Sequence, residues 1–264
     1  MRAIYTNNGE YCIEIKYCAE LERHLSVMFP YEKHTKMQYP LVGCIFVDFS
    51  SGLYSINYLD DCLYTTLELN KIPVILMNLL DRILQANSAH IVMHGAAFTR
   101  NGSAIILSQG RYSGKSTLLY HMVNKSNIQY IDDDILFVNE SNMVIGPSFP
   151  IKMRSSITNQ TLQAYDDCEN EIYLYSPPNV VDNFTPIKFI VFPKYKINQK
   201  NELTVLKGKK KVEMFIENMK SQFFSLNKFD CFSFIQGIPA FEIKYNTTEV
   251  AEQFLNEIED ILQS

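Results

Sequence analysis

Alternating hydrophobic and polar positions dominate the first part of the chain. Residues 11–17 and 53–58 alternate with a period of two, which predicts strands that each bury one face. Residues 41–47 form an almost continuous apolar run, which predicts a buried strand, and residues 50–52 predict the turn after it. We therefore expect residues 1–70 to form a β-rich region that is available for substrate recognition.

Helical spacing begins near Pro73, a residue suited to the first turn of a helix. Apolar residues between positions 74 and 84 cover a wide face, which predicts a helix that packs deeply. Asn78, Asp81 and Arg82 interrupt this run, and no window approaches the roughly 18 apolar residues of a membrane span. We expect no membrane partner.

Residues 71–264 mix strands and helices, which predicts an α/β domain with a mixed (α+β) sheet. The strongest turn signal is Asn101-Gly102, which predicts a two-residue hairpin between strands that include 98–100 and 104–107. The other expected strands are 91–93, 128–131, 135–138, 143–145, 186–193 and 240–245, residues 147–154 are expected to be extended, and the expected helices are 117–123, 212–220 and 250–262.

Composition narrows the classes of function. The formal net charge of −5 argues against a protein that binds nucleic acid through its overall field, and the basic run 207–211 is interpreted as a solvated turn or helix start. None of the six cysteines forms a Cys-x-x-Cys pair, so we expect no structural zinc. Free thiols and the lack of a signal-peptide pattern favour a cytoplasmic protein.

A candidate phosphate loop lies between an apolar strand and an apolar helix, at residues 108–117. Gly114, Lys115 and Ser116 match the end of the P-loop motif, in which Lys reaches the outer phosphates and Ser or Thr binds Mg²⁺. Gln109 stands where the motif has its first Gly. Either Gly110 makes the turn or the loop enters differently; the alternative is a Gly-rich turn that only packs.

A cluster of acidic residues follows the candidate phosphate loop along the chain. Asp132 lies 17 residues beyond Lys115, which leaves room for one helix, one turn and one strand. A right-handed crossover would place the acidic cluster at the end of a strand that neighbours the one before the loop. Such carboxylates can bind Mg²⁺ or accept a proton, and the alternative is a solvated acidic turn. His94 is either a structural group or part of the same site.

These segments together resemble a known family. His94-Gly95-Ala96-Ala97, residues 104–107, residues 113–118 and the double Asp look like the C-terminal kinase fold of HPr kinase/phosphorylase, which is similar to phosphoenolpyruvate carboxykinase. The resemblance spans about residues 75–262. It implies a P-loop core and transfer of phosphate from ATP to a hydroxyl with Mg²⁺. Some small stand-alone members look like kinases that phosphorylate a serine of a lasso-peptide precursor.

The resemblance also implies roles for individual residues. It implies Asp133 as the catalytic base and Asp134 as a metal ligand, unless the register is shifted by one, and it places His94 near the transferred phosphate. The resemblance implies Ser116 as the second metal ligand, and Arg154 is a candidate substrate contact. The residues implied to contact phosphate are Gly110, Ser113, Gly114, Lys115, Ser116 and Thr117. Gln109 and the lack of an Arg-Gly-rich signature depart from the family and disfavour a bifunctional regulator.

Three functions stay open at this point. The first is a kinase acting on a serine of a peptide or protein, such as the precursor of a ribosomal peptide natural product. The second is a small-molecule kinase of the type that acts on free serine. The third is a nucleotide-binding adaptor without turnover, in which Gln109 has degraded the loop. The sequence gives neither the acceptor nor the oligomeric state, and a homo-oligomer stays open.

Overall fold

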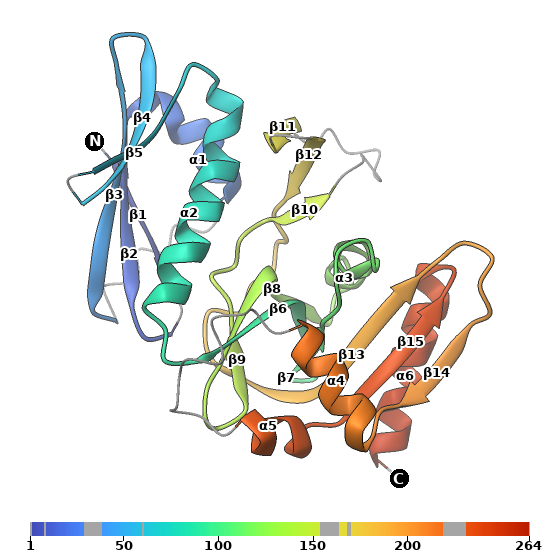
Figure 1. Ribbon diagram of the computed structural model, residues 1–264. Coiled ribbons are helices and arrows are strands. Elements are labelled where there is room, and N and C mark those ends of the chain that lie inside the picture. Colours follow the sequence, from blue (N-terminus) through green and yellow to red (C-terminus); the bar gives the residue numbers. More distant parts are fainter. Residues whose placement is uncertain are drawn as a thin grey trace. The chain divides into compact units, whose positions relative to one another are not determined.

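The computed structural model describes residues 2–7, 9–28, 39–59, 61–153, 164–167, 170–218 and 231–263. The chain divides into two compact units, the first made of Met1–Ser88 and Gly146–Pro178, the second of Ala89–Ile145 and Asn179–Ser264 (Figure 1).

The described residues of the first unit form two sheets and two α-helices. Its larger sheet has the order β1-β2-β3-β4-β5, in which only β2 and β3 are parallel, and its smaller antiparallel sheet has the order β10-β12-β11. The elements are β1 (Arg2–Asn7), β2 (Cys12–Tyr17), η1 (Ala19–Leu21), α1 (Glu22–Met28), β3 (Leu41–Ser50), β4 (Leu53–Tyr58), β5 (Asp61–Thr66), η2 (Leu69–Lys71), α2 (Ile72–Ala86), β10 (Ile151–Met153), β11 (Ala164–Asp167) and β12 (Asn170–Tyr175).

The first unit differs from the expectation in two ways. Helix α2 packs with α1 and β11, so the unit extends past residue 70 and also takes in residues 146–178. The expected buried strand at 41–47 is present within β3, but only Ile45 and Val47 of it are buried. The prediction of burial on both faces is therefore wrong, because the side chains of β3 that alternate with Ile45 and Val47 are partly or fully exposed.

The second unit is built on a seven-stranded sheet with the order β14-β15-β13-β7-β6-β8-β9. Strand β13 is parallel to both β15 and β7, whereas β6 is antiparallel to β7 and to β8. The elements are β6 (Ile91–Arg100), β7 (Ser103–Leu107), α3 (Lys115–Val123), β8 (Ile128–Val138), β9 (Met143–Ile145), β13 (Thr185–Tyr195), β14 (Glu202–Val205), α4 (Gly208–Asn218), α5 (Cys231–Gly237), β15 (Ala240–Tyr245) and α6 (Thr248–Gln263).

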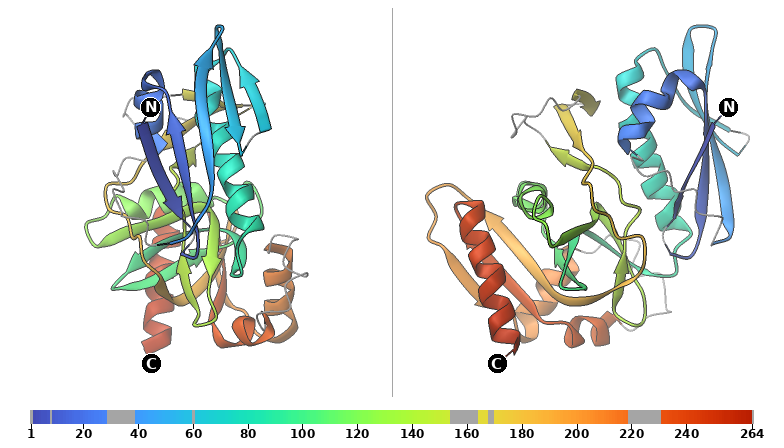
Figure 2. Two further views of the ribbon diagram at one scale, coloured as in Figure 1. Left: turned by 90° about the vertical axis from the view of Figure 1, so that its left-hand side faces the viewer. Right: turned by 180° about the vertical axis from the view of Figure 1, so that it is seen from behind.

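Helices cover both faces of this sheet. Met214 and Phe215 of α4 and Phe234 of α5 join a buried core with Ile190 and Phe192 of β13. Helix α6 packs on β15 and beside α3, on the face away from α4 (Figure 2). Coverage on both faces explains why β7 and β13 are almost continuous apolar runs. The expected mixed α/β class, with sheets of mixed orientation, is confirmed.

Several local predictions are confirmed within this unit. Asn101 and Gly102 have positive φ angles of 54° and 74°, as a two-residue hairpin of the primed type requires, and Arg100 pairs with Ser103 across the turn. The basic run begins helix α4, and the closing helix is α6. Among the described residues, no helix is both long and apolar enough to cross a membrane.

Candidate functional site

The 108–114 loop connects the end of β7 to the start of α3. Gly114 is the N-cap of α3, and no side chain caps the helix. The positive φ angles of the loop lie at Tyr112 (65°) and Gly114 (91°), and neither Gln109 nor Gly110 is among the positive-φ residues. Gln109 therefore does not need the conformation that favours glycine, and the loop turns at its end instead of its beginning.

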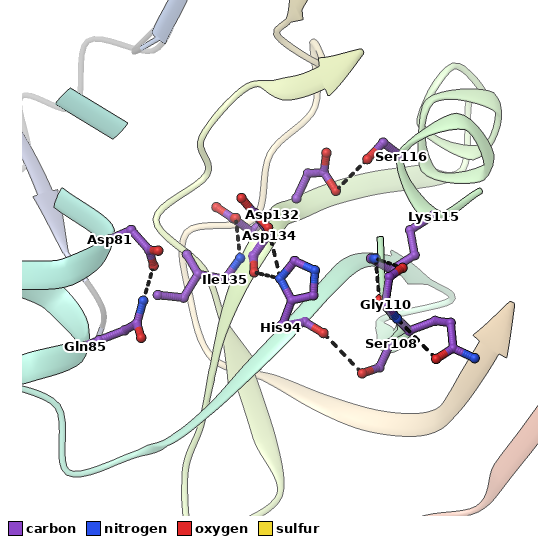
Figure 3. A network of polar contacts seen from close by, with 12 residues as sticks. Asp81, Gln85, His94, Ser108, Gly110, Lys115, Ser116, Asp132, Asp134 and Ile135 are labelled. Carbon is purple, nitrogen blue, oxygen red and sulfur yellow. Dashed lines mark hydrogen bonds and ion pairs between the residues drawn. The ribbon is translucent and has the colours of Figure 1, made fainter. Parts of the chain in front are cut away.

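Lys115 is the first residue of α3 and reaches back over the loop. Its Nζ donates hydrogen bonds to the carbonyl oxygens of Gln109 (2.5 Å) and Gly110 (3.1 Å) (Figure 3). The side chain is buried, which lowers the pKa of Lys115, while the charges of Asp133 and Asp134 oppose this shift. An anion bound beside the ammonium would favour its charged form.

Ser116, the next residue of α3, faces the acidic strand. Its hydroxyl donates a hydrogen bond to Oδ1 of Asp133 at 3.2 Å. Asp133 is 3% exposed and Asp132 is fully buried, with Oδ1 of Asp132 accepting a bond from the Ile135 backbone N–H at 3.4 Å. The alternative of a solvated acidic turn is therefore wrong, because two of the three carboxylates lie inside the protein.

Asp134 and His94 form a pair on neighbouring strands. Nδ1 of His94 lies 2.9 Å from Oδ1 of Asp134 and 3.1 Å from its backbone oxygen (Figure 3). Asp134 has a φ of 108°, a strained value for a residue with a side chain. Both side chains keep partial exposure, 28% for His94 and 39% for Asp134, so the pair is accessible to a small reactant.

A hydrogen bond ties this pair to the loop region. Ser108, the first loop residue, donates from Oγ to the backbone oxygen of His94 at 3.1 Å. Gly95, the next residue, lies so close to β7 that a Cβ there would stand 3.0 Å from the Leu107 oxygen. The absence of a side chain at Gly95 therefore lets β6 approach the strand that leads into the loop.

The position of the acidic strand corrects the sequence prediction in two respects. Strand β8 does not neighbour β7, because the hairpin places β6 on one edge of β7 and β13 occupies the other. Asp132, Asp133 and Asp134 lie inside β8 instead of at its end, opposite Ala97, Ala96 and Gly95. An irregularity in the pairing between Ala97 and Phe98, together with the strained Asp134, lets the cluster interrupt a strand that continues on both sides.

The structure brings most of the predicted residues together, whereas among the described residues the side chains of Ser113 and Thr117 make no hydrogen bond to them. Oγ of Ser113 is buried and has no hydrogen-bond partner among the described residues. Thr117 is exposed. Apart from its chain neighbours, no described residue comes within 4 Å of the position that a Cβ of Gly110 would take. Ser116 contacts Asp133, whereas the predicted metal ligand was Asp134, which contacts His94. Arg154 lies outside the described residues.

Sequence reasoning missed three residues of the site. Tyr195 and Tyr245 approach Gly114 from β13 and β15, and Ser108 links the loop to His94. Tyr245 is 131 positions from Gly114, so no local pattern could have indicated it. The described part of the chain contains no group of three or more His, Cys, Asp or Glu side chains suited to a metal ion.

Comparisons with known proteins give little beyond this geometry. No protein-family model matches the chain, and no curated protein matches it. Among solved structures it is similar to the Hpr(Ser) kinase/phosphatase from Coxiella burnetii, with 12% sequence identity and a TM-score of 0.34, over 66% of this chain and 99% of that chain.

Proposed function

We propose that the chain is an ATP-dependent kinase that transfers the γ-phosphoryl group to a hydroxyl group. One observation carries the proposal: two consecutive residues at the start of α3 face two different parts of the site. The ammonium of Lys115 lies on the carbonyls of the 108–114 loop, and the hydroxyl of Ser116 lies on the carboxylate of Asp133. Phosphoryl transfer needs such a cation and such a pair of oxygen ligands side by side.

The start of α3 provides the phosphate-binding groups. The first-turn N–H groups of a helix lack partners within the helix, and its dipole attracts anions there. No side chain caps α3, and the buried Ser113 hydroxyl beside it has no partner among the described residues. Lys115 supplies the positive charge. Together these groups suit the β- and γ-phosphates of ATP.

Ser116 and Asp133 suit Mg²⁺. Their oxygens lie 3.2 Å apart, and hydroxyl and carboxylate oxygens are the hard ligands that Mg²⁺ prefers. Magnesium in kinases uses one or two protein carboxylates and completes its shell with phosphate oxygens and water, so a larger cluster of acidic residues is not required. Bound there, the ion would neutralise charge on the phosphates. We assign Asp133 to the metal, in place of Asp134, for which the resemblance implied that role.

His94 and Asp134 suit the proton transfer. Nδ1 of His94 faces two oxygen acceptors of Asp134, so it is the nitrogen that carries the proton. In the neutral ring Nε2 then keeps its lone pair and can accept the proton of an attacking hydroxyl. Asp134 holds the ring in this orientation and stabilises the imidazolium that forms. This gives the strained backbone of Asp134 a role.

The acceptor is proposed to be a serine of a peptide or protein, such as the precursor of a ribosomal peptide product. This part rests on the resemblance of the sequence motifs to small kinases of that kind. The ordinary backbone of Gln109 removes the reason for regarding the loop as degraded, so a non-catalytic adaptor has no observation in its favour. A kinase for free serine stays as the second outcome of the test.

The test is a transfer assay with Mg²⁺ and γ-labelled ATP against two acceptor sets, a library of serine-containing peptides and free serine with related small hydroxy compounds. Mass spectrometry identifies the labelled product. Labelled peptides support the full proposal, and labelled free serine moves the acceptor to the small-molecule class. ATP binding without transfer to either set would contradict the kinase and support an adaptor.

A further inference from the structure

Two tyrosines end neighbouring parallel strands directly beside the 108–114 loop. Tyr195 is the last residue of β13 and Tyr245 the last residue of β15, and the two are partners in the register of the sheet. Their ring centroids lie 5.6 Å apart at an interplanar angle of 53°. Tyr245 is 1% exposed and Tyr195 is 42% exposed. We call these residues the tyrosine pair.

The tyrosine pair binds the last two carbonyl groups of the loop. The backbone N–H of Tyr195 donates to the Ser113 oxygen at 3.0 Å, and Oη of Tyr245 donates to the Gly114 oxygen at 3.3 Å. The Gly114 oxygen also accepts the first helical bond of α3, from the Leu118 N–H at 2.9 Å. The end of the loop is therefore held by strands that lie far from it in the sequence.

These bonds fix the direction of two N–H groups. In a planar trans peptide the N–H points opposite to the carbonyl of the same unit. Because the Ser113 and Gly114 carbonyls point to the tyrosine pair, the N–H groups of Gly114 and Lys115 point to the opposite side. That side is the N-terminal opening of α3, where an anion would lie.

Close packing of the tyrosine pair on Gly114 holds the loop in addition to the hydrogen bonds. A Cβ at Gly114 would lie 2.3 Å from Oη of Tyr245 and 2.8 Å from Cβ of Tyr195. The tyrosine pair therefore touches the backbone of the loop directly and leaves room only for glycine. Burial, with a smaller effect of Tyr195, raises the pKa of Tyr245, so its hydroxyl keeps its proton and stays a donor at neutral and moderately alkaline pH.

We infer that the tyrosine pair consists of positioning residues that set the shape of the phosphate-binding loop from outside, and that this support lets the loop work without a glycine at position 109. The inference rests on the proposed function. In the usual loop the first glycine gives the backbone its freedom to turn. Here the turn falls at Tyr112 and Gly114, and the strand ends hold Gly114 in place.

The experiment measures binding of MgADP by calorimetry, which needs no acceptor and no turnover. Tyr245→Phe removes one hydroxyl and keeps the ring, and Tyr120→Phe on α3 is the matched control outside the loop. One hydrogen bond is worth roughly 0.5–1.5 kcal/mol, so we expect Tyr245→Phe to weaken MgADP binding by roughly two- to tenfold. Tyr120→Phe should bind as the wild type does. Melting temperatures without nucleotide report the stability of each variant.

The outcomes separate the inference from the function on which it rests. If the wild type does not bind MgADP, both are overturned. If the wild type binds and Tyr245→Phe binds equally well, or melts earlier with unchanged affinity, the positioning role is overturned and the function stands. Should Tyr245→Phe fail to fold, Tyr195→Ala decides. That variant keeps the backbone N–H and the Cβ of Tyr195 but removes the ring that packs against Tyr245. An unchanged affinity for MgADP would overturn the inference.

Discussion

The two sides of the candidate site are held in different ways. On the loop side, the carbonyl groups of Gln109, Gly110, Ser113 and Gly114 all accept hydrogen bonds. Of the two positive φ angles there, one falls on Gly114 and the other, 65° at Tyr112, lies in the ordinary left-handed region. On the acidic side, β8 keeps Asp132 and Asp133 buried and Asp134 in a strained conformation. Asp134 is one of the few non-glycine residues with a positive φ in the described chain.

The comparison shows what holds each side of the site in place. The carbonyl groups of the loop side have hydrogen-bond partners in the free protein, and under the proposed function a phosphate would add bonds to N–H groups that already face it. On the acidic side, the strained backbone of Asp134 opposes folding, at a cost of about 1–3 kcal/mol. Such a cost persists where the surrounding structure enforces it, and strain of this kind is concentrated at functional sites.

The largest expected effect comes from removing one charged group on each side. Lys115→Ala removes the cation from the loop and Asp133→Asn removes the carboxylate beside Ser116, so each should lower phosphoryl transfer by at least about 10²–10³-fold while the protein stays folded. Steady-state assays and circular dichroism check this. Lys125→Ala is the control, since Lys125 pairs with Glu252 outside the site. Full activity in either site variant would contradict the proposed site.

The next effect separates proton transfer from nucleotide binding. His94→Ala should lower kcat by roughly 10²–10⁴-fold, the usual contribution of a general base, and leave the affinity for MgADP nearly unchanged. His121→Ala is the matched control, because His121 also pairs with a carboxylate, Glu252, but away from the site. A large loss of MgADP affinity in His94→Ala would place His94 in nucleotide binding instead.

Features set by neighbouring residues could be predicted from the sequence. The Asn101-Gly102 hairpin depends on two residues that favour positive φ, and helix α2 depends on Pro73 and an apolar stripe. The loop and α3 could also be predicted, because the motif around Lys115 consists of residues that are neighbours in the sequence.

Features set by long-range packing could not be predicted. Strand β8 pairs with β6 instead of β7 because β13 occupies the second edge of β7. The contact between Tyr245 and Gly114 joins residues 131 positions apart. Nothing in the run of three aspartates indicates which one is buried beside Ser116 and which one takes a positive φ, because both depend on the pairing of β8 with β6.

A stability comparison at Asp134 tests the strain on the acidic side. Asp134→Gly and Asp134→Ala both remove the carboxylate that meets His94, but only glycine adopts a φ of 108° without a steric cost. After the entropic cost of glycine, we expect Asp134→Gly to be more stable than Asp134→Ala by about 1 kcal/mol. Urea unfolding of the two variants measures the difference. Equal stability, or a more stable Ala variant, would contradict the strain.

The smallest expected effect concerns the loop side and pH. Burial lowers the pKa of folded Lys115 below its ordinary value of about 10.5, so between these two pKa values the unfolded state binds more protons. The contribution of Lys115 to stability therefore rises with pH through this window. Measured against Lys115→Met in urea, the wild type should gain relative stability as the pH rises toward 10.5. A constant difference or a relative loss would contradict a desolvated lysine.

The central claim is that the start of α3 binds the phosphates of ATP. The most direct measurement is calorimetric titration of the wild-type protein with AMP, ADP and ATP in the presence of Mg²⁺. The account predicts weak binding of AMP and a marked gain in affinity once the β-phosphate reaches Lys115 and the N–H groups of the loop. No binding of any of the three, or equal affinity for AMP and ATP, would contradict it.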